Sequence, residues 1–251
     1  MIPRIIHQSW KTKDVPASMR EFQESWLKHH PGWEYRLWTD EDNERLIREH
    51  YPQFEESFHR FTPTIIKIDF IRLAYMHRFG GIYADMDFEA LRPLDSLVSD
   101  GRIAVGRENG GIGIPMCGRP FIVNAFLASP AGHPLLLDIM QAMSDRFRQR
   151  QRFEPHAFHV IRMTIQIFDE RVVAYARDHD DITIHSHVLF YPAPPSMRFK
   201  DERRELAGKL NSYAIHHYAN TWVGWHIRLI NGVETLKQLW QRRRRSGSGF
   251  E

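Results

Sequence analysis

Two acidic residues, Asp85 and Asp87, stand two positions apart in the segment GGIYADMDFE, residues 80–89. They follow a short apolar run that is typical of a buried strand. In a strand or tight bend alternate side chains point the same way, so both carboxylates can converge while Met86 faces the core. Oxygen ligands of this kind suit Mg2+ or Mn2+ together with phosphate oxygens and water. Residue chemistry alone leaves two interpretations open, a metal site at a strand end or two solvated acids in a capped turn.

The Asp-x-Asp spacing is weak evidence by itself, because the chain contains it three times. Asp40 and Asp42 fit the N-terminus of a helix, where carboxylates accept backbone N–H bonds and favour the positive end of the dipole. Asp178 and Asp180 fall in a charged turn, RDHDD. Only the pair at 85 and 87 ends an apolar strand, and ligands of open α/β sheets gather beyond the carboxyl ends of strands.

A second candidate pair, Asp69 and Arg72, lies in the segment TPTIIKIDFIRLAYMHRFGG. The two residues are three apart and share a face of the predicted helix, beside an apolar stripe. They form either a modest ion pair on a wet surface or a sugar-binding pair, in which Asp69 accepts from hydroxyl groups and Arg72 contacts sugar or phosphate.

These residues must be positioned by an alternation of helices and strands, which predicts an α/β sandwich. The segment from Thr62-Pro63 to Phe79 is expected to be a helix that Gly80 and Gly81 end. The segment GGIGIPMCGRP is expected to be a loop. The other expected helices are 16–30, 40–51, 135–152 and 165–177, and the expected strands begin at Ile2 and cover 33–40, 82–85, 102–106, the start of 121–134, 182–186 and 188–192.

Composition narrows the function classes. The chain has 251 residues, is 42% apolar and carries a formal charge of +3. Cys117 is its single cysteine, which excludes an intrachain disulfide and a cysteine-based zinc site. No basic stripe occurs outside the C-terminal end, and no P-loop or nucleic-acid-binding motif is present, so a nucleic-acid partner is not expected.

The C-terminal end holds an unbroken basic run, Arg242 to Arg245, close to Trp240. This run is interpreted either as a solvated tail or as a segment attracted to anionic lipid head groups. The sequence shows neither a basic-then-apolar leader nor an apolar run near 18 residues. The expected location is therefore the cytoplasm, with the tail as the candidate for peripheral contact with the inner face of a membrane.

Five segments, taken in order, resemble glycosyltransferase family 32, the group of initiating α-mannosyltransferases and related sugar transferases. The glycosyltransferase domains of large clostridial toxins are distantly similar. The similarity covers roughly residues 2 to 225, and its most specific part runs from Asp69 to Asp95. The segments are IPRIIHQSWK, PGWEYRLWTDED, KIDFIRLAYMHRFGGIYADMDFEALRPLD, NAFLASPAGHPLL and YAIHHYANTW.

This resemblance implies a GT-A (Rossmann-like) nucleotide-sugar transferase fold with a mixed central sheet. It is expected as a single domain over residues 1–235, followed by a basic tail over 236–251. The resemblance also implies a UDP- or GDP-sugar donor, Mn2+ (or Mg2+) and retention of anomeric configuration. The expected acceptor is a glycan, a glycolipid or a protein hydroxyl. Members of the family often carry a Thr-Gly-Pro turn after the long middle helix, whereas here the chain has VIRMTIQIFDE, so the acceptor is not fixed by the resemblance.

Residue by residue, the resemblance places the donor and the metal. Asp69 and Arg72 would hold the donor sugar, Asp85 would meet ribose or sugar as well as the cation, and Asp87 would bind the cation. His216 opens the family's His-x4-Ser/Thr-Trp pattern, completed by Thr221 and Trp222, and would lie near the metal. The expected catalytic residues are Asp85, Asp87, Asp69 and Arg72, the metal ligands Asp87, His216 and Asp85, and the donor-binding residues Trp10, His7, Tyr83, Asn124 and Trp222.

Two rival functions remain open at this point. A glycoside hydrolase would pair Asp85 or Asp87 with a distant Glu, because such enzymes need two carboxyl groups flanking the scissile bond. A non-catalytic protein could instead use the same fold to bind nucleotide-sugars or glycans. Turnover of nucleotide-sugars against simple glycosides separates the first rival, and a thermal shift with UDP, GDP and Mn2+ separates the second.

Overall fold

The computed structural model describes residues 1–111, 113–148 and 156–219. Residues 1–217 form one unit, and residues 218–251 are assigned to a second. The expected domain boundary at 235 and the basic run at Arg242 to Arg245 lie outside the described residues. No helix among the described residues combines the length and the apolar character that crossing a membrane requires.

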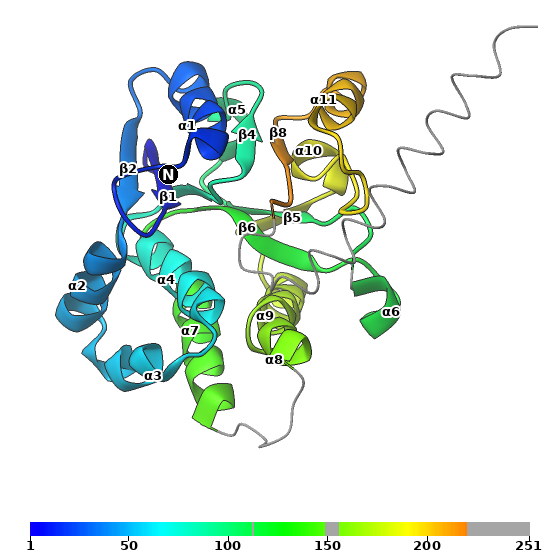
Figure 1. The fold of residues 1–251 in the computed structure, drawn as a ribbon. Helices are drawn as coiled ribbons and strands as arrows, with labels where there is room; N and C mark the ends of the chain where they lie inside the picture. The colour runs from blue at the N-terminus through cyan, green and yellow to red at the C-terminus, as the bar shows by residue number, and fades with distance from the viewer. Residues whose placement is uncertain (112, 149–155, 220–251) are drawn as a thin grey trace, which may run out of the picture. The chain divides into compact units, whose positions relative to one another are not determined.

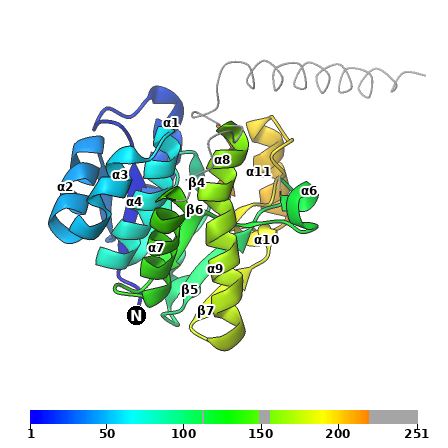
Figure 2. The same cartoon turned by 90° about the horizontal axis from the view of Figure 1, so that it is seen from below.

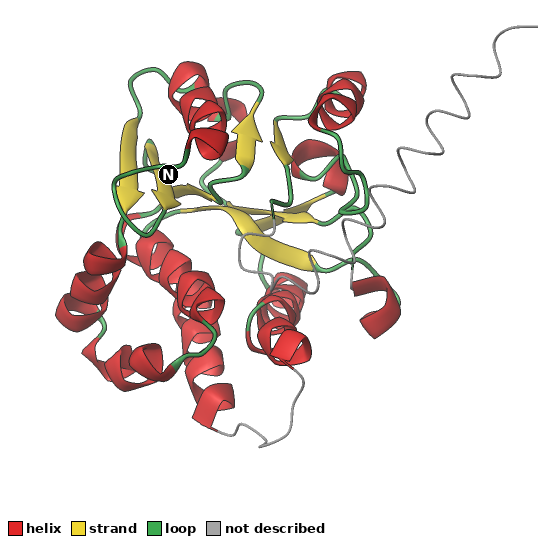
Figure 3. Ribbon diagram, in the orientation of Figure 1, coloured by secondary structure: helices red, strands yellow, loops and turns green. Residues whose placement is uncertain are grey.

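A six-stranded sheet forms the centre of the first unit (Figure 3). Its order is β2-β1-β3-β6-β5-β7, and every neighbouring pair is parallel except the two that β6 makes with β3 and β5. A separate two-stranded antiparallel sheet pairs β4 with β8. The strands are β1 Ile5–Ser9, β2 Glu34–Trp38, β3 Gly81–Ala84, β4 Phe88–Ala90, β5 Ile103–Arg107, β6 Ile122–Ser129, β7 Ile182–His185 and β8 Ala214–His216.

Helices cover both faces of this sheet, which confirms the α/β sandwich. In Figure 1, α2, α3, α4, α7, α8 and α9 lie on one face, while α1, α5, α10 and α11 lie on the other with the small sheet. Figure 2 shows α4, α7 and α9 side by side. The helices are α1 Ala17–His29, α2 Asp40–His50, α3 Glu55–Arg60 (after a 3-10 turn, Pro52–Phe54), α4 Thr64–Phe79, α5 Asp95–Val98, α6 Gly113–Cys117, α7 Pro134–Arg148, α8 His156–Met163, α9 Ile165–Asp178, α10 His187–Phe190 and α11 Lys200–Lys209.

Two expected elements differ from the structure. Residues 188–192 were expected to be a strand, but α10 is a helical turn that Tyr191 closes by donating its N–H to the carbonyl of His187 at 2.7 Å. The helical turn buries Phe190, whose ring stacks on that of Phe126 with 4.0 Å between ring centroids. The segment therefore buries its apolar side chain without pairing as a strand. The expected loop GGIGIPMCGRP contains the short helix α6.

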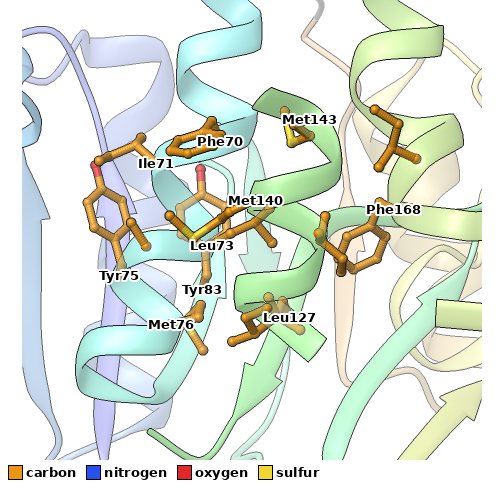
Figure 4. Packing of buried hydrophobic residues seen from close by; sticks show 14 of the residues in the cluster. Phe70, Ile71, Leu73, Tyr75, Met76, Tyr83, Leu127, Met140, Met143 and Phe168 are labelled. Atoms are coloured by element: carbon orange, nitrogen blue, oxygen red, sulfur yellow. The ribbon is translucent and has the colours of Figure 1, made fainter. Parts of the chain in front are cut away.

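The helix α4 is buried on nearly all sides, and this determines the environment of the candidate pair Asp69 and Arg72. Figure 4 shows its Phe70, Leu73 and Met76 packed among Met140 and Met143 of α7. Fully burying one such side chain stabilises the fold by about 1.5–3 kcal/mol. On this helix Asp69 and Arg72 are 5% and 2% exposed, so the interpretation of them as a surface ion pair is wrong.

Two glycines connect α4 to β3, and both have positive φ angles, +64° at Gly80 and +105° at Gly81. A Cβ at position 81 would overlap the carbonyl oxygen of Ile5 in the neighbouring strand. Glycine is therefore required here both for the backbone conformation and for the close approach of β1 and β3.

We expect Gly81→Ala to destabilise the protein much more than Gly32→Ala. Gly32 also has a positive φ, +81°, but a Cβ there meets no atom within 4 Å. Gly32→Ala should lower the free energy of unfolding by about 1 kcal/mol, for the left-handed conformation alone. Gly81→Ala should lower it by about 3 kcal/mol or more, because the backbone of Ile5 cannot move aside. Urea unfolding measures both free energies, and equal losses would contradict the close strand contact.

Candidate functional site

The acidic pair lies in a tight turn between the two sheets. Asp85 extends the edge of β3 by one residue, since its N–H donates to the carbonyl of Ala125 in β6 at 2.9 Å. The N–H of Phe88 then donates back to the carbonyl of Asp85 at 2.9 Å, and β4 begins. The turn is therefore fixed at both ends by backbone hydrogen bonds.

Met86 anchors this turn, as the alternation of side chains predicts. It is 5% exposed and belongs to a small apolar cluster with Val15, Met19 and Phe22, against which Trp10 packs. The side chains of Asp85 and Asp87 retain 25% and 14% of their exposure. The two carboxylates thus converge on a partly open space while the residue between them is buried.

The second strand of the small sheet brings His216 to the acidic pair. Phe88 and His216 are paired across β4 and β8, and their rings stack at 5.0 Å. The backbone N–H of His217 donates to the carbonyl of Asp87 at 2.9 Å, and buried Arg203 donates to the carbonyl of His216 at 3.0 Å. These contacts hold His216 Nε2 3.2 Å from Asp87 Oδ1.

Asp85, Asp87 and His216 can act as a metal-binding triad. One potential ligand atom from each lies within 4.8 Å of the others. Two carboxylates and an imidazole are donors that suit Mn2+. Burial acts to lower the pKa of His216, but Asp87, Asp85 and Glu108 together outweigh burial, so that pKa is raised. The acidic pair favours a positive charge beside it, which either a proton on the His216 ring or a bound cation would supply. The residues present therefore fit the implied metal.

Arg72 is the centre of a buried polar group beside this triad. Its Nη2 lies 2.9 Å from Asp69 Oδ1 and 3.1 Å from Asp85 Oδ1, and its Nη1 donates to Asn124 Oδ1 at 3.1 Å. Burial opposes its charge, but the two carboxylates raise the pKa of Arg72 above its ordinary value. Burial raises the pKa of Asp69 and of Asp85 despite the arginine. Arg72 therefore joins three expected site residues into one charged unit.

Tyr83 orients the first carboxylate. Its hydroxyl donates to Asp85 Oδ1 at 2.8 Å, and the Arg72 guanidinium lies 4.8 Å above its ring. Tyr83 is 1% exposed, and its hydroxyl also lies 3.5 Å from Ser9 Oγ, so its contacts are with protein groups rather than with open space. Because Arg72 and Tyr83 both reach Oδ1, Oδ2 is the oxygen that remains for a ligand.

Asn124 owes its position to an irregularity in the sheet. The pairing of β5 with β6 shifts register between Val105 and Gly106. Around the shift the β6 backbone bonds outside the ladder, with the Asn124 carbonyl accepting from Arg72 Nη1 at 3.1 Å and the Phe126 N–H donating to the Tyr191 hydroxyl oxygen at 3.0 Å. Bulges of this kind often re-aim side chains next to functional sites. Asn124 is 4% exposed and contacts the arginine; its contact with a sugar stays a prediction.

His7 is not brought to this cluster. It is fully buried on the α4 side of β1, where it accepts from Trp38 Nε1 through Nδ1 at 3.0 Å and meets the Gly80 carbonyl through Nε2 at 2.8 Å. Both ring nitrogens are occupied by these contacts, so in this structure His7 offers no atom to a nucleotide-sugar. Its neighbour Gln8, which sequence reasoning missed, donates to the Asp85 carbonyl at 3.1 Å. Nothing in the residue types distinguishes the two, and only the face of the strand does.

Trp10 and Trp222 were expected to contact the donor. Trp10 is half-buried in the cluster that contains Met86, so its ring lies beside the turn that carries the acidic pair. Trp222 and Thr221 lie outside the described residues. Tyr191 was also missed; it is buried, and its ring meets that of His216 edge-on at 5.9 Å. Tyr191 was missed because residues 188–192 were expected to be a strand.

With this geometry established, similarity to known families becomes informative. Residues 16–104, which include the acidic pair, match the family described as the glycosyltransferase sugar-binding region containing a DXD motif. Over these residues the chain is similar to that family. The resemblance to glycosyltransferase family 32 is thereby confirmed.

Three relatives illustrate the range of this glycosyltransferase family. The mannosyl phosphorylinositol ceramide synthase SUR1 of Saccharomyces cerevisiae is 33% identical over 143 residues, 57% of this chain and 35% of the relative. The inositol phosphoceramide mannosyltransferase 2 of Schizosaccharomyces pombe is 40% identical over 98 residues, 39% of this chain and 28% of the relative. The initiation-specific alpha-1,6-mannosyltransferase of Saccharomyces cerevisiae is 32% identical over 109 residues, 40% and 23%. The matched region thus spans about a third or less of each.

One solved structure supports the fold. The PaToxG glycosyltransferase superposes with a TM-score of 0.51 at 15% identity, covering 69% of either chain. At that identity the likeness concerns the fold alone. Together with the mixed central sheet, it confirms the GT-A fold that the resemblance implied.

The buried position of His7 generates a pH prediction. Burial lowers its pKa from 6.5 to about 4. The unfolded chain therefore takes up this proton near pH 6.5 and the folded protein only near pH 4. The stability that neutral His7 contributes is complete above pH 6.5 and is lost as the pH falls toward 4, at about 1.4 kcal/mol per pH unit.

Replacing His7 with Gln, which does not titrate, should remove this contribution. Urea unfolding between pH 7 and pH 4.5 should show a steeper loss of stability in the wild type than in His7→Gln. The variant is expected to be less stable at pH 7, because Trp38 and the Gly80 carbonyl lose a well-placed partner. Parallel pH curves would show that His7 is not buried as the neutral form.

Proposed function

We propose that this protein is a metal-dependent, retaining glycosyltransferase that moves a hexose from a UDP- or GDP-sugar to a hydroxyl group. The observation that carries the proposal is the convergence of Asp85, Asp87 and His216 within 4.8 Å at the carboxyl end of the sheet. Similarity to a transferase family by itself fits a degenerate pocket as well as an active one. Three potential metal ligands, two from the turn after β3 and one from β8, come together from parts of the chain far apart in sequence. This convergence favours an active pocket.

The metal-binding triad would hold Mn2+ or Mg2+ against the donor diphosphate. When bound, such a cation supplies Lewis-acid stabilisation of the departing phosphate. The protein's own groups do the remaining work. Arg72 holds Asp85 by Oδ1, so the carboxylate cannot rotate away, and His216 is fixed by its stack on Phe88. Pre-organised charges of this kind cost no rearrangement when the leaving group develops its charge.

The nucleobase is proposed to stack on Trp10. Its ring packs against the apolar cluster that contains Met86, the residue between the two carboxylates, and is only partly buried. An aromatic face at that distance from a diphosphate site suits uracil and guanine alike. Four expected site residues are buried against one another in this structure: Asp69, Arg72, Tyr83 and Asn124. Their direct contacts with the sugar are part of the proposal.

Among the possible hexoses and acceptors, the relatives favour mannose and a polyol head group. Several are named for mannosyl transfer to inositol phosphoceramide. We therefore propose GDP-mannose as the first donor to test and a lipid-linked inositol as the first acceptor. An acceptor of that kind would bring the protein to a membrane surface, where the run Arg242 to Arg245 would meet anionic head groups; its expected location is the cytoplasmic side.

The test is Asp87→Asn compared with Asp180→Asn. Nucleotide release from UDP- and GDP-sugars is measured with Mn2+ and with chelator. Asp87→Asn should lose at least about 100-fold of the metal-dependent rate, because it removes a charged ligand from the site of leaving-group stabilisation. Asp180 has the same Asp-x-Asp spacing but is exposed in a turn, so its variant should keep the wild-type rate.

Three outcomes would contradict the proposed function. Wild-type release that chelator does not affect would exclude metal dependence. Hydrolysis of simple glycosides without any nucleotide-sugar turnover would favour the hydrolase interpretation. A thermal shift with UDP or GDP and Mn2+ but no turnover of any donor would favour the non-catalytic binding protein.

A further inference from the structure

A third acidic residue, Glu108, lies at the same edge of the sheet as the metal-binding triad. The strands β1, β3 and β5 run in the same direction, because β6 is antiparallel to both of its neighbours. Their carboxyl ends therefore share one edge. Trp10 follows β1, Asp85 follows β3, and Glu108 follows β5 directly.

The sheet order β1-β3-β6-β5 arranges these groups in a row. Neighbouring strands are about 4.8 Å apart, so β5 lies roughly 10 Å beyond β3, on the side away from Trp10. If the nucleobase stacks on Trp10 and the diphosphate meets the triad, the sugar extends toward β6 and β5. The position after β5 is then where a second substrate would approach.

The side chain of Glu108 is directed to the face on which His216 lies. Gly106, two residues earlier in β5, faces the Tyr191 ring so closely that a Cβ there would lie 2.8 Å from Tyr191 Cε2. Alternate residues of a strand share a face, so Glu108 continues toward Tyr191. The ring of Tyr191 meets that of His216 at 5.9 Å. In agreement, the charge of Glu108 acts to raise the pKa values of both Tyr191 and His216.

The loop that begins at Glu108 is fastened to the body of the protein. The N–H of Glu108 donates to the Phe121 carbonyl at 2.9 Å, and Asn109 Nδ2 donates to the Pro192 carbonyl at 2.7 Å. At the far end of the loop, Arg119 forms a two-pronged ion pair with buried Asp169 at 2.8 and 2.6 Å. These bonds fix the backbone on both sides of the carboxylate.

Gly111 leaves room for the carboxylate itself. The backbone turns back at Gly110 and Gly111, with φ angles of +85° and +75°, and the Glu108 carboxylate lies against Gly111 where a Cβ would stand. A Cβ at Gly110 would meet no atom within 4 Å. The second glycine, unlike the first, therefore leaves space that the Glu108 side chain occupies.

From these positions we propose that Glu108 is an acceptor-binding residue, whose carboxylate accepts hydrogen bonds from hydroxyl groups of a polyol or sugar acceptor. This inference rests on the proposed transferase function and adds to it the side from which the acceptor enters. A carboxylate repels phosphate when no cation lies between them. Glu108 therefore selects the hydroxyl-bearing ring of the acceptor and not a phosphate attached to it. It acts by positioning, and no proton transfer is assigned to it.

The experiment separates binding of the two substrates. Donor hydrolysis without acceptor is measured for the first of GDP-mannose, UDP-glucose, UDP-galactose and UDP-N-acetylglucosamine that the wild type cleaves. Transfer is then measured with myo-inositol and methyl α-mannoside as acceptors. Glu108→Gln should raise the acceptor KM about 10- to 100-fold, because the uncharged amide accepts weaker hydrogen bonds than the carboxylate and offers only one acceptor oxygen. Donor KM and the hydrolysis rate should stay within about twofold of wild type.

Gly111→Ala and Gly110→Ala form the matched control pair. Both place alanine at a positive φ in the same loop, but only the first displaces the Glu108 carboxylate. Gly111→Ala should reproduce the acceptor effect of Glu108→Gln, while Gly110→Ala should leave the acceptor KM near that of the wild type. This comparison keeps the test meaningful even if the loop tolerates alanine poorly, because the conformational cost is shared.

Each remaining outcome decides against one of the two proposals. A wild type that cleaves no nucleotide-sugar overturns the proposed function itself. If the wild type cleaves a donor, an unchanged acceptor KM in Glu108→Gln overturns the acceptor role. A donor KM that rises instead places Glu108 on the donor side, and a wild type that gains no rate from either polyol counts against a hydroxyl-binding role at this edge.

Discussion

The Arg72 guanidinium is the group on which the site depends most. It is 2% exposed and binds two carboxylates and an amide at once, so its removal would leave buried Asp69 and partly buried Asp85 without their cationic partner. Breaking a buried charge pair in this way typically costs about 3–5 kcal/mol, much more than the intact pair contributes. The arrangement therefore stabilises the fold little but allows one geometry. In that geometry Asp85 shows a single oxygen to the open space.

The fold keeps Arg72 in place through features that would reduce stability at most other positions of a protein. Burial of α4 on nearly all sides excludes water from the guanidinium. The bulge in β6 turns a backbone carbonyl and the Asn124 side chain toward it, at the cost of regular ladder pairing with β5. The glycine pair before β3 lets β1 approach closely enough for Gln8 to hold the Asp85 carbonyl. Packing, bulge and glycines thus act together on one residue, Asp85.

Sequence reasoning predicted the fold class and the position of the acidic pair because both depend on short-range patterns. Alternating elements indicate an α/β sandwich, and an apolar run followed by Asp-x-Asp places two acids at a strand end. The same reasoning left Asp69 and Arg72 open between a surface pair and a site. Their spacing describes one helix face, whereas their burial depends on α7 and the sheet, which pack on that helix from elsewhere in the chain.

The residues that were missed share another cause. Gln8 and His7 are adjacent, and their roles differ only because they face opposite sides of β1, which requires knowledge of what covers each side. Tyr191 belongs to a segment whose apolar residues fit a strand as well as a buried helical turn. Glu108 follows an ordinary strand, and its position matters only once the order β1-β3-β6-β5 is known. Each of these depends on tertiary neighbours and not on residue type.

The metal-binding triad also links binding to the assembly of the fold. Asp87 and His216 are far apart in sequence and meet only because β8 pairs with β4. That small sheet has three residue pairs and is reinforced by the Phe88–His216 stack and by the Arg203 hydrogen bond to the strand's carbonyl. A cation shared by Asp87 and His216 would bind only the paired form, so it would stabilise the docking of β8 by mass action.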